Sequence, residues 1–222
     1  MSNQLEDKKK RAQIIIKTLK KLFPNTKSAL NYSNPWEFLV AVILSAQCTD
    51  KRVNIVTEKL FKKYKNVSNY ASAKLSEFEQ DIRSTGFYKN KAKNVISTAK
   101  IIHEKYKDKL PQTMEEMLTL PGVARKTANV VLSNAFGVVE GIAVDTHVRR
   151  LSNLYGLTSQ VDPDKIEKDL MQLMPKSEWP EFTLRMIDYG RAYCPAKKHD
   201  HEKCPVTVAF KEAGIHPKEQ YR

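Results

Sequence analysis

The stretch Leu-Pro-Gly-Val-Ala-Arg-Lys-Thr-Ala, at residues 120–128, holds the residues whose types and spacing are best suited to chemistry. A helix is expected to end there, a short turn is built around Pro121 and Gly122, and a second helix is expected to begin at about Arg125. Gly122 permits a positive φ and a close backbone approach, so the N–H groups of the turn and of the next helix can form a concave anion site. Such a hairpin can hold a phosphate of a nucleic-acid backbone, although an ordinary helix–helix turn capped by glycine has the same pattern.

A second chemically capable group lies near the C-terminus. Four side chains within eleven residues offer two sulfurs and two imidazoles, namely Cys194, His199, His201 and Cys204. Zinc accepts this set of ligands, but the spacing is not that of a standard zinc finger. The three cysteines of the chain are scattered and odd in number, which does not make a disulfide framework and fits a reducing compartment.

These residues must be positioned by helices. Apolar side chains recur at three- to four-residue spacing nearly everywhere, and no convincing run alternates with a period of two. N-cap residues, prolines at the first helical position and a capping box mark several helix starts. Helices are expected over residues 11–23, after Asn34-Pro35, from Asp50, from Ser72 to Gly86, over 92–102, after the Thr113–Glu116 capping box, over 128–136 and after Asp162-Pro163. The pattern predicts an all-α fold.

The charge of the chain indicates a polyanionic partner. It has 222 residues, with 38 Lys and Arg against 25 Asp and Glu, a formal net charge of +13 and a pI near 9.5. Lysine and arginine release the counterions that condense on a phosphate backbone, so this balance favours nucleic acid over a merely solubilising surface. No apolar run approaches membrane-spanning length, and the polar residues 1–11 do not look like a signal peptide. We therefore expect a cytoplasmic, nucleoid-associated monomer without a membrane partner.

Several separate motifs, in the same order along the chain, resemble the helix-hairpin-helix (HhH-GPD) DNA glycosylases, and most closely the endonuclease III family. They are Leu-Ser-Ala-Gln-Cys-Thr-Asp at 44–50, Gly-Phe-Tyr-Lys-Asn-Lys-Ala at 86–92, the hairpin at 120–128, Val-Asp-Thr-His-Val at 144–148 and Tyr-Gly-Arg at 189–191. The resemblance spans about residues 10 to 205. It implies an enzyme of base excision repair that flips a damaged base out of duplex DNA and excises it.

The resemblance assigns the chemistry to two residues. It implies that Lys126 attacks the sugar C1′, displaces the base and forms a Schiff base, so that β-elimination cuts the strand. Without the resemblance, Lys126 would be one more phosphate-binding lysine. Asp145 is implied to stabilise the cationic sugar and to assist proton transfer, which is compatible with capping a helix because a capping carboxylate is rigidly placed.

The other site residues are implied to bind DNA. Gln47 would fill the gap left by the flipped base and Phe87 would act as a wedge, whereas a helix C-cap and a core aromatic are the structural alternatives. His147 would orient neighbouring groups or touch the DNA backbone, unless it is an ordinary surface histidine. The remaining candidates are the hairpin residues Gly122, Ala124 and Arg125, and the pair Lys197 and Lys198, which would contact phosphates or form a solvated surface pair.

The sequence departs from the family at the C-terminal loop. Endonuclease III proteins usually carry a [4Fe–4S] cluster on four cysteines spaced C-x6-C-x2-C-x5-C. Cys194 and Cys204 match the first and third cysteines, but the second position holds His201 and the fourth holds Phe210. Two thiolates are too few for such a cluster, so we expect no iron–sulfur cluster and no other cofactor, with zinc on the four Cys and His side chains as the alternative. Two further departures are Ala124 in place of a hairpin glycine and a charged Arg150 at a usually apolar position.

By this resemblance we expect two helical lobes with a DNA-binding cleft between them. One lobe is a helical barrel over residues 28–139 that ends in the hairpin, and the other comprises residues 1–27 and 140–222 with the degenerate cluster loop. The expected activity is that of a bifunctional DNA glycosylase and AP lyase that removes oxidised pyrimidines. The alternatives are an AP lyase alone, or a non-catalytic hairpin protein that only binds DNA.

Overall fold

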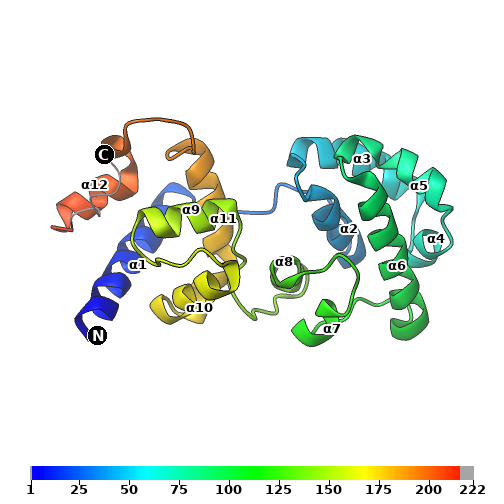
Figure 1. Cartoon of the computed structure of the whole chain (residues 1–222), viewed down its shortest axis with the longest axis horizontal. Helices are drawn as coiled ribbons and strands as arrows, with labels where there is room; N and C mark the ends of the chain where they lie inside the picture. The colour runs from blue at the N-terminus through cyan, green and yellow to red at the C-terminus, as the bar shows by residue number, and fades with distance from the viewer. Residues whose placement is uncertain (1, 216–222) are drawn as a thin grey trace. The chain divides into compact units, whose positions relative to one another are not determined.

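The computed structural model describes residues 2–215, and every regular element in this range is a helix (Figure 1). The predicted all-α fold is confirmed. None of the described helices is both long enough and apolar enough to cross a membrane. The chain divides into two compact units, residues 28–140 and residues 1–27 with 141–222.

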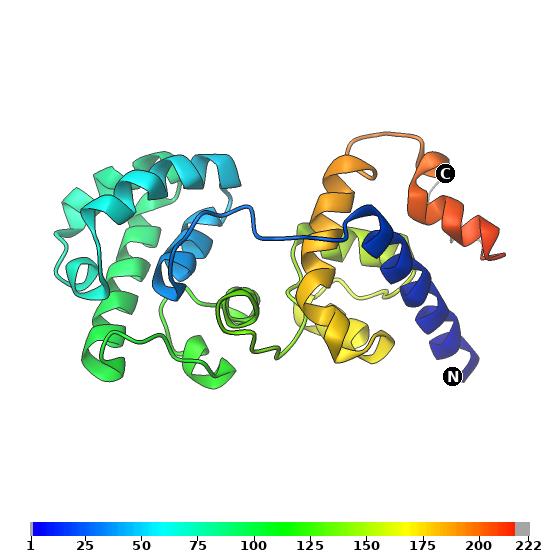
Figure 2. The ribbon, with the colours of Figure 1, turned by 180° about the vertical axis from the view of Figure 1, so that it is seen from behind.

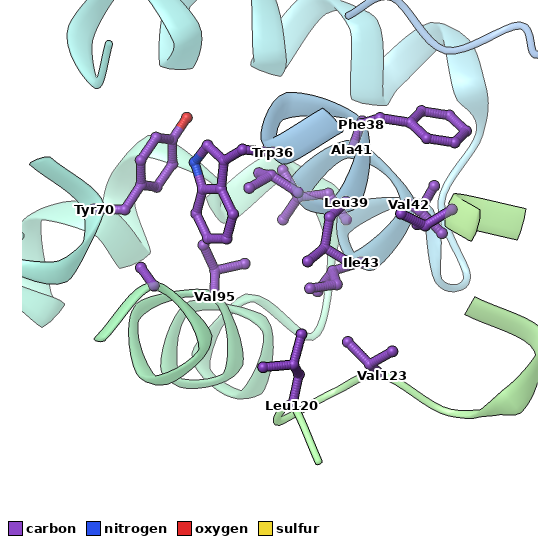
Figure 3. Close-up of a cluster of buried hydrophobic side chains, with 14 of the residues drawn as sticks. Trp36, Phe38, Leu39, Ala41, Val42, Ile43, Tyr70, Val95, Leu120 and Val123 are labelled. Carbon is purple, nitrogen blue, oxygen red and sulfur yellow. The ribbon is translucent and has the colours of Figure 1, made fainter. Parts of the chain in front are cut away.

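The unit of residues 28–140 is built around α2 (Pro35–Ser45). Its start is the predicted one, because the side chain of Asn34 accepts a hydrogen bond from the N–H of Glu37 at 3.0 Å and Pro35 is the first helical residue. The helix is apolar on all sides and is therefore buried by its neighbours (Figure 3). Those neighbours are α3 (Asp50–Lys63), α4 (Val67–Ala71), α5 (Leu75–Asp81), the 3-10 turn η1 (Arg83–Thr85), α6 (Tyr88–Tyr106), α7 (Met114–Leu118) and α8 (Arg125–Phe136).

The other unit joins the N-terminal helix to the C-terminal part of the chain. Helix α1 (Ser2–Leu22) lies against α11 (Trp179–Ala192) and α12 (Pro205–Glu212) (Figure 2). Its remaining elements are α9 (Thr146–Leu154), α10 (Pro163–Leu173) and the 3-10 turns η2 (Lys176–Glu178) and η3 (His201–Lys203). Ile15 and Leu19 of α1 share one buried core with Leu151 of α9 and Phe210 of α12.

Two of the predicted helix starts are wrong. The first helix begins at Ser2 and not near residue 11, because its polar first half consists largely of Lys, Gln and Glu, which favour helix without any apolar period. The helix expected from Ser72 begins at Leu75 and ends at Asp81. The hydroxyl and the N–H of Ser72 both donate to the carbonyl of Ser68, so this serine ends α4 and does not start α5.

Candidate active site

The hairpin between α7 and α8 is fixed on the core of its unit. Leu120 and Val123 are buried on either side of the turn (Figure 3), and Thr98 of α6 donates a hydrogen bond to the carbonyl of Pro121 at 2.9 Å. Gly122 has a φ of +76°, and a Cβ there would lie 2.7 Å from Nδ2 of Asn94. The turn therefore requires glycine for two reasons, its left-handed backbone and its close approach to α6.

The N-terminus of α8 carries no side-chain cap. Ala124 occupies the N-cap position with φ −86° and ψ 170°, and its side chain offers no acceptor to the N–H groups of the first turn. Since φ is negative, alanine causes no strain where the family usually has glycine. Arg125 and Lys126 are the first two residues of α8, and Lys126 is exposed. The helix thus presents an N-terminus without a side-chain cap, a positive dipole end and an exposed amine together, which suits an anion site beside a potential nucleophile.

Asp145 is the N-cap of α9 and accepts a hydrogen bond from the N–H of Val148 at 2.8 Å. The capping geometry anticipated from the sequence is confirmed, and it holds one carboxylate oxygen in a fixed place. Asp145 belongs to the unit of residues 1–27 and 141–222, whereas Lys126 belongs to the unit of residues 28–140.

His147 lies in the first turn of α9 and packs directly on α11. A Cβ at Gly190 would lie 2.4 Å from Nδ1 of His147, so the Tyr-Gly-Arg motif needs glycine to admit the imidazole ring. This nitrogen is buried without a hydrogen-bond partner. Burial lowers the pKa of His147 below its ordinary value, and Arg150 and Arg191 lower it further against the opposing charge of Asp145. The ring is therefore a half-buried group that packs against α11 and is not freely exposed.

Two exposed turns in the unit of residues 28–140 present the residues expected to enter the DNA helix. Gln47 has a φ of +52° and follows Ala46, the C-cap of α2. Phe87 has a φ of +48°, follows Gly86 at +70°, and is 65% exposed. The alternative that Phe87 is a core aromatic is wrong. A large apolar side chain held in solvent on a left-handed backbone is strained and unburied, as expected of a residue that serves binding.

Sequence reasoning missed Lys91, which joins these two turns. Its Nζ donates to the carbonyl of Leu44, before the first turn, and to the carbonyl of Thr85, before the second, at 2.8 Å each. Only 5% of the residue is exposed, and burial lowers the pKa of Lys91. The available signal was its position one helical turn before Val95, on the apolar stripe of α6, where a lysine is out of place unless it is paired.

The four Cys and His side chains of the C-terminal loop converge. Their ligand atoms all lie within 4.8 Å of one another, and both cysteines are buried. Lys197 and Lys198 are exposed within the same loop, between Cys194 and His199. The loop also helps to line a pocket of about 640 Å³ with the first turns of α9, so it lies beside the helix that Asp145 caps.

The residues of this loop do not fit a four-cysteine cluster. Phe210 occupies the fourth ligand position, is 1% exposed and packs edge-on against the ring of Tyr155, with ring centroids 5.6 Å apart. The second position holds the imidazole of His201. The geometry favours the metal site that the sequence kept as an alternative over a loop without a metal.

Comparisons with known proteins agree with one another. Residues 40–176 match the family described as HhH-GPD superfamily base excision DNA repair protein. The chain is 51% identical to an endonuclease III of Synechocystis sp., over 92% of this chain and 93% of the relative, and 46% identical to an endonuclease III of Bacillus subtilis, over 86% and 87%. Among solved structures, it is similar to a non-covalent endonuclease III–DNA complex with a TM-score of 0.85 and 43% identity, covering 93% of this chain and 98% of that one. A trapped covalent endonuclease III–DNA intermediate matches with the same TM-score and identity, covering 92% and 98%.

Proposed function

The chain belongs to the HhH-GPD superfamily of base excision DNA repair proteins, and within it to the endonuclease III family, and we propose that it is a bifunctional DNA glycosylase and AP lyase acting on duplex DNA. One observation carries this proposal. An exposed lysine stands beside an uncapped helix N-terminus, in a chain that aligns over nearly its whole length with a protein trapped covalently on DNA.

The hairpin supplies the DNA anchor of the proposed mechanism. Its turn at Gly122 and the N-terminus of α8 bind a phosphate without contacting bases, which places Lys126 next to the sugar–phosphate backbone. Gln47 and Phe87 enter the helix where the damaged base has left it. Lys197 and Lys198 add phosphate contacts from the C-terminal loop.

Lys126 and Asp145 carry out the covalent steps. The amine of Lys126 forms a bond to C1′ as the glycosidic C–N bond breaks, and the base leaves with the bonding electrons and takes up a proton. Asp145 stabilises the positive charge that develops on the sugar and accepts the proton that Lys126 loses. The sugar ring then opens to a Schiff base, a C2′ proton is removed, and the C3′–O bond breaks, so that the strand is cut. Hydrolysis releases Lys126.

We propose oxidised pyrimidines as the damaged bases and the cytoplasm, on the nucleoid, as the place of action. An AP lyase without base excision and a protein that only binds DNA are the alternatives. The presence of Asp145 in a chain that also carries Lys126 in its hairpin supports the enzyme, because a phosphate anchor has no use for that carboxylate.

Borohydride trapping on duplexes that carry either thymine glycol or an abasic site tests the proposal. We expect the wild type to form a covalent adduct on both duplexes. Lys126→Gln should lose the adduct and reduce strand cleavage to less than roughly one thousandth, while still binding DNA. Lys165→Gln, at an exposed lysine in the first turn of α10, is the matched control and should behave as the wild type.

The substrates separate the alternatives. An adduct on the abasic duplex alone would indicate a lyase. No adduct on either duplex, with tight and salt-dependent binding, would indicate a binding protein or a different lesion. Nicking by Lys126→Gln at the wild-type rate would exclude Lys126 as the nucleophile.

A further inference from the structure

We infer that Cys194, His199, His201 and Cys204 bind one zinc ion, which takes the place of the iron–sulfur cluster in this chain. All four ligand atoms lie within 4.8 Å of one another. Sγ of Cys194 is 3.6 Å from Nδ1 of His201, and Sγ of Cys204 is 3.4 Å from Nε2 of His199. A tetrahedral zinc ion, with bonds of about 2.3 Å to sulfur and about 2.0 Å to nitrogen, holds a sulfur and a nitrogen about 3.6 Å apart.

The type and charge of the ligands select the ion. Two thiolates with two imidazoles are a tetrahedral S₂N₂ set, which suits zinc and does not suit magnesium or calcium. Two thiolate charges neutralise a divalent ion, so the site can be buried without net charge. Both sulfurs come from buried cysteines and the two imidazoles are partly exposed, which leaves a path for the ion to enter.

The short distances among the four ligand atoms argue against an iron–sulfur cluster. The terminal ligands of an iron–sulfur cluster bind different iron atoms, so they stand further apart than the ligands of a single ion. Here the ligand atoms are within 4.8 Å of one another, and the aromatic ring of Phe210 fills the core where the family has its fourth cysteine. The loop therefore has room and ligands for one ion only.

Residues outside the ligand set support this assignment. Nη2 of Arg150 donates to the carbonyl of Cys194 at 2.6 Å, and Nη1 lies 3.9 Å from its sulfur. The hydroxyl of Tyr155 points at the same sulfur from 3.7 Å and also pairs with the hydroxyl of Tyr189 at 2.9 Å. Donors directed at a ligating thiolate are the usual second layer of a metal site. They also give a physical reason for the charged Arg150.

Zinc would fix the loop that presents Lys197 and Lys198. Both ends of the loop, at Cys194 and Cys204, would be joined through the ion, and the pair of lysines lies between them. The same loop contacts α9 through Arg150, so the ion would also support the helix that Asp145 caps. The site is structural, because all four positions of a tetrahedral ion are taken by protein atoms.

Metal analysis of the full-length protein, purified without an affinity tag, tests the inference independently of any DNA-repair activity. We expect about one zinc per chain, as in a closed structural site. Reconstitution with Co²⁺ should give the visible bands of a tetrahedral ion together with a near-ultraviolet thiolate-to-cobalt band. Zinc affinity should fall at least roughly 100-fold in His199→Asn, since even the loss of a supporting residue costs 10- to 100-fold.

Two matched variants serve as controls in the other unit of the chain. Cys48→Ser removes a half-buried cysteine and His103→Asn removes an exposed histidine, and both should keep the zinc and the cobalt spectrum. Circular dichroism establishes that each variant is folded. His199→Asn is the informative variant because its side chain is only partly buried, whereas Cys204→Ser, at a buried position, is a second variant if His199→Asn fails to fold.

Two results would overturn the inference. A brown protein with about four irons per chain would show a cluster held by unusual ligands. A folded wild type that holds no zinc and gives no thiolate band with Co²⁺ would show that hydrogen bonds alone hold the loop, such as the one from the thiol of Cys204 to the carbonyl of Tyr193 at 3.3 Å.

Discussion

The two loop systems that present the residues proposed to contact DNA are stabilised differently, one by a lysine of the chain and the other, as we propose, by a metal ion. In the unit of residues 28–140, the turns at Gln47 and Phe87 meet at the ammonium group of Lys91, which donates to one backbone carbonyl before each turn. In the other unit, the loop with Lys197 and Lys198 is closed by four side chains that suit a metal ion. The first cation is covalently part of the chain. The second must come from solution, so only the second loop responds to the supply of metal.

Four substitutions test this comparison, and Lys91→Met should have the largest effect among them. It leaves the carbonyls of Leu44 and Thr85 without their buried donor, so we expect a loss of about 2–6 kcal/mol of folding stability, at about 1–3 kcal/mol for each carbonyl. Because we propose that the two turns act on a base pair, we expect excision from duplex DNA to fall more than excision from single-stranded DNA. Urea unfolding and the ratio of the two excision rates are the measurements.

The ratio of the excision rates on duplex and single-stranded DNA shows whether Lys91 positions the two turns or only stabilises the fold. Lys93→Met, at an exposed lysine on the same helix, should leave both the stability and the ratio unchanged. If Lys91→Met loses stability but keeps the wild-type ratio, Lys91 supports the fold and does not position the turns. Chelation should not alter the effect of Lys91→Met, since the candidate metal ligands found among the described residues all belong to the other unit.

Gly122→Ala should have the next largest effect, and it tests whether the left-handed backbone of Gly122 is needed for the hairpin turn. Gly122→Ala puts a Cβ at 2.7 Å from the side chain of Asn94 on a backbone with φ +76°, so we expect a loss of about 1–3 kcal/mol of stability. The displaced turn should also lose a phosphate contact, which lowers the dependence of log K on log salt by about 1. Fluorescence anisotropy at several salt concentrations measures this slope. An unchanged slope would show that the turn does not bind a phosphate.

Arg150→Met tests the loop between Cys194 and Cys204, which is the other loop system of the comparison. Its hydrogen bond to the carbonyl of Cys194 is charge-assisted, and such bonds contribute about 1.5–3 kcal/mol. With zinc bound, the ion also holds Cys194, so we expect a loss of only about 1 kcal/mol, rising to about 2 kcal/mol after chelation. Urea unfolding with and without a chelator gives both values. Equal losses in the two conditions would contradict a shared role of Arg150 and the ion.

Features that depend on a few neighbouring residues were predictable from the sequence, although one of them misled the prediction. The caps at Asn34, Asp145 and Asp162 were predictable because each acts within three residues of the helix that it starts. Ser72 misled the prediction because serine can end a helix through the carbonyl four residues before it as readily as it can start one.

Contacts between distant parts of the chain were beyond local patterns. Lys91 gains its meaning from the carbonyl of Leu44, which is 47 residues away. The set Cys194, His199, His201 and Cys204 lies within eleven residues and was visible in the sequence. Its spacing follows no familiar zinc motif, however, so the convergence of its ligand atoms within 4.8 Å became evident only in the structure. Packing, and not local propensity, decides such sites.

Ala124→Gly should have the smallest effect. It tests whether the backbone at Ala124 keeps its negative φ when DNA binds. Glycine is a better N-cap residue than alanine by about 0.5–1 kcal/mol, but it also adds about 0.4–1 kcal/mol of backbone entropy to the unfolded chain. These opposing contributions should leave the stability within about 0.5 kcal/mol of the wild type. DNA affinity should be unchanged, because Ala124 already has a negative φ of −86° and leaves the N–H groups of α8 uncapped. A tenfold gain in affinity would show that this residue changes to a positive φ on DNA, so that the hairpin, unlike the turns held by Lys91, adapts its backbone to the ligand.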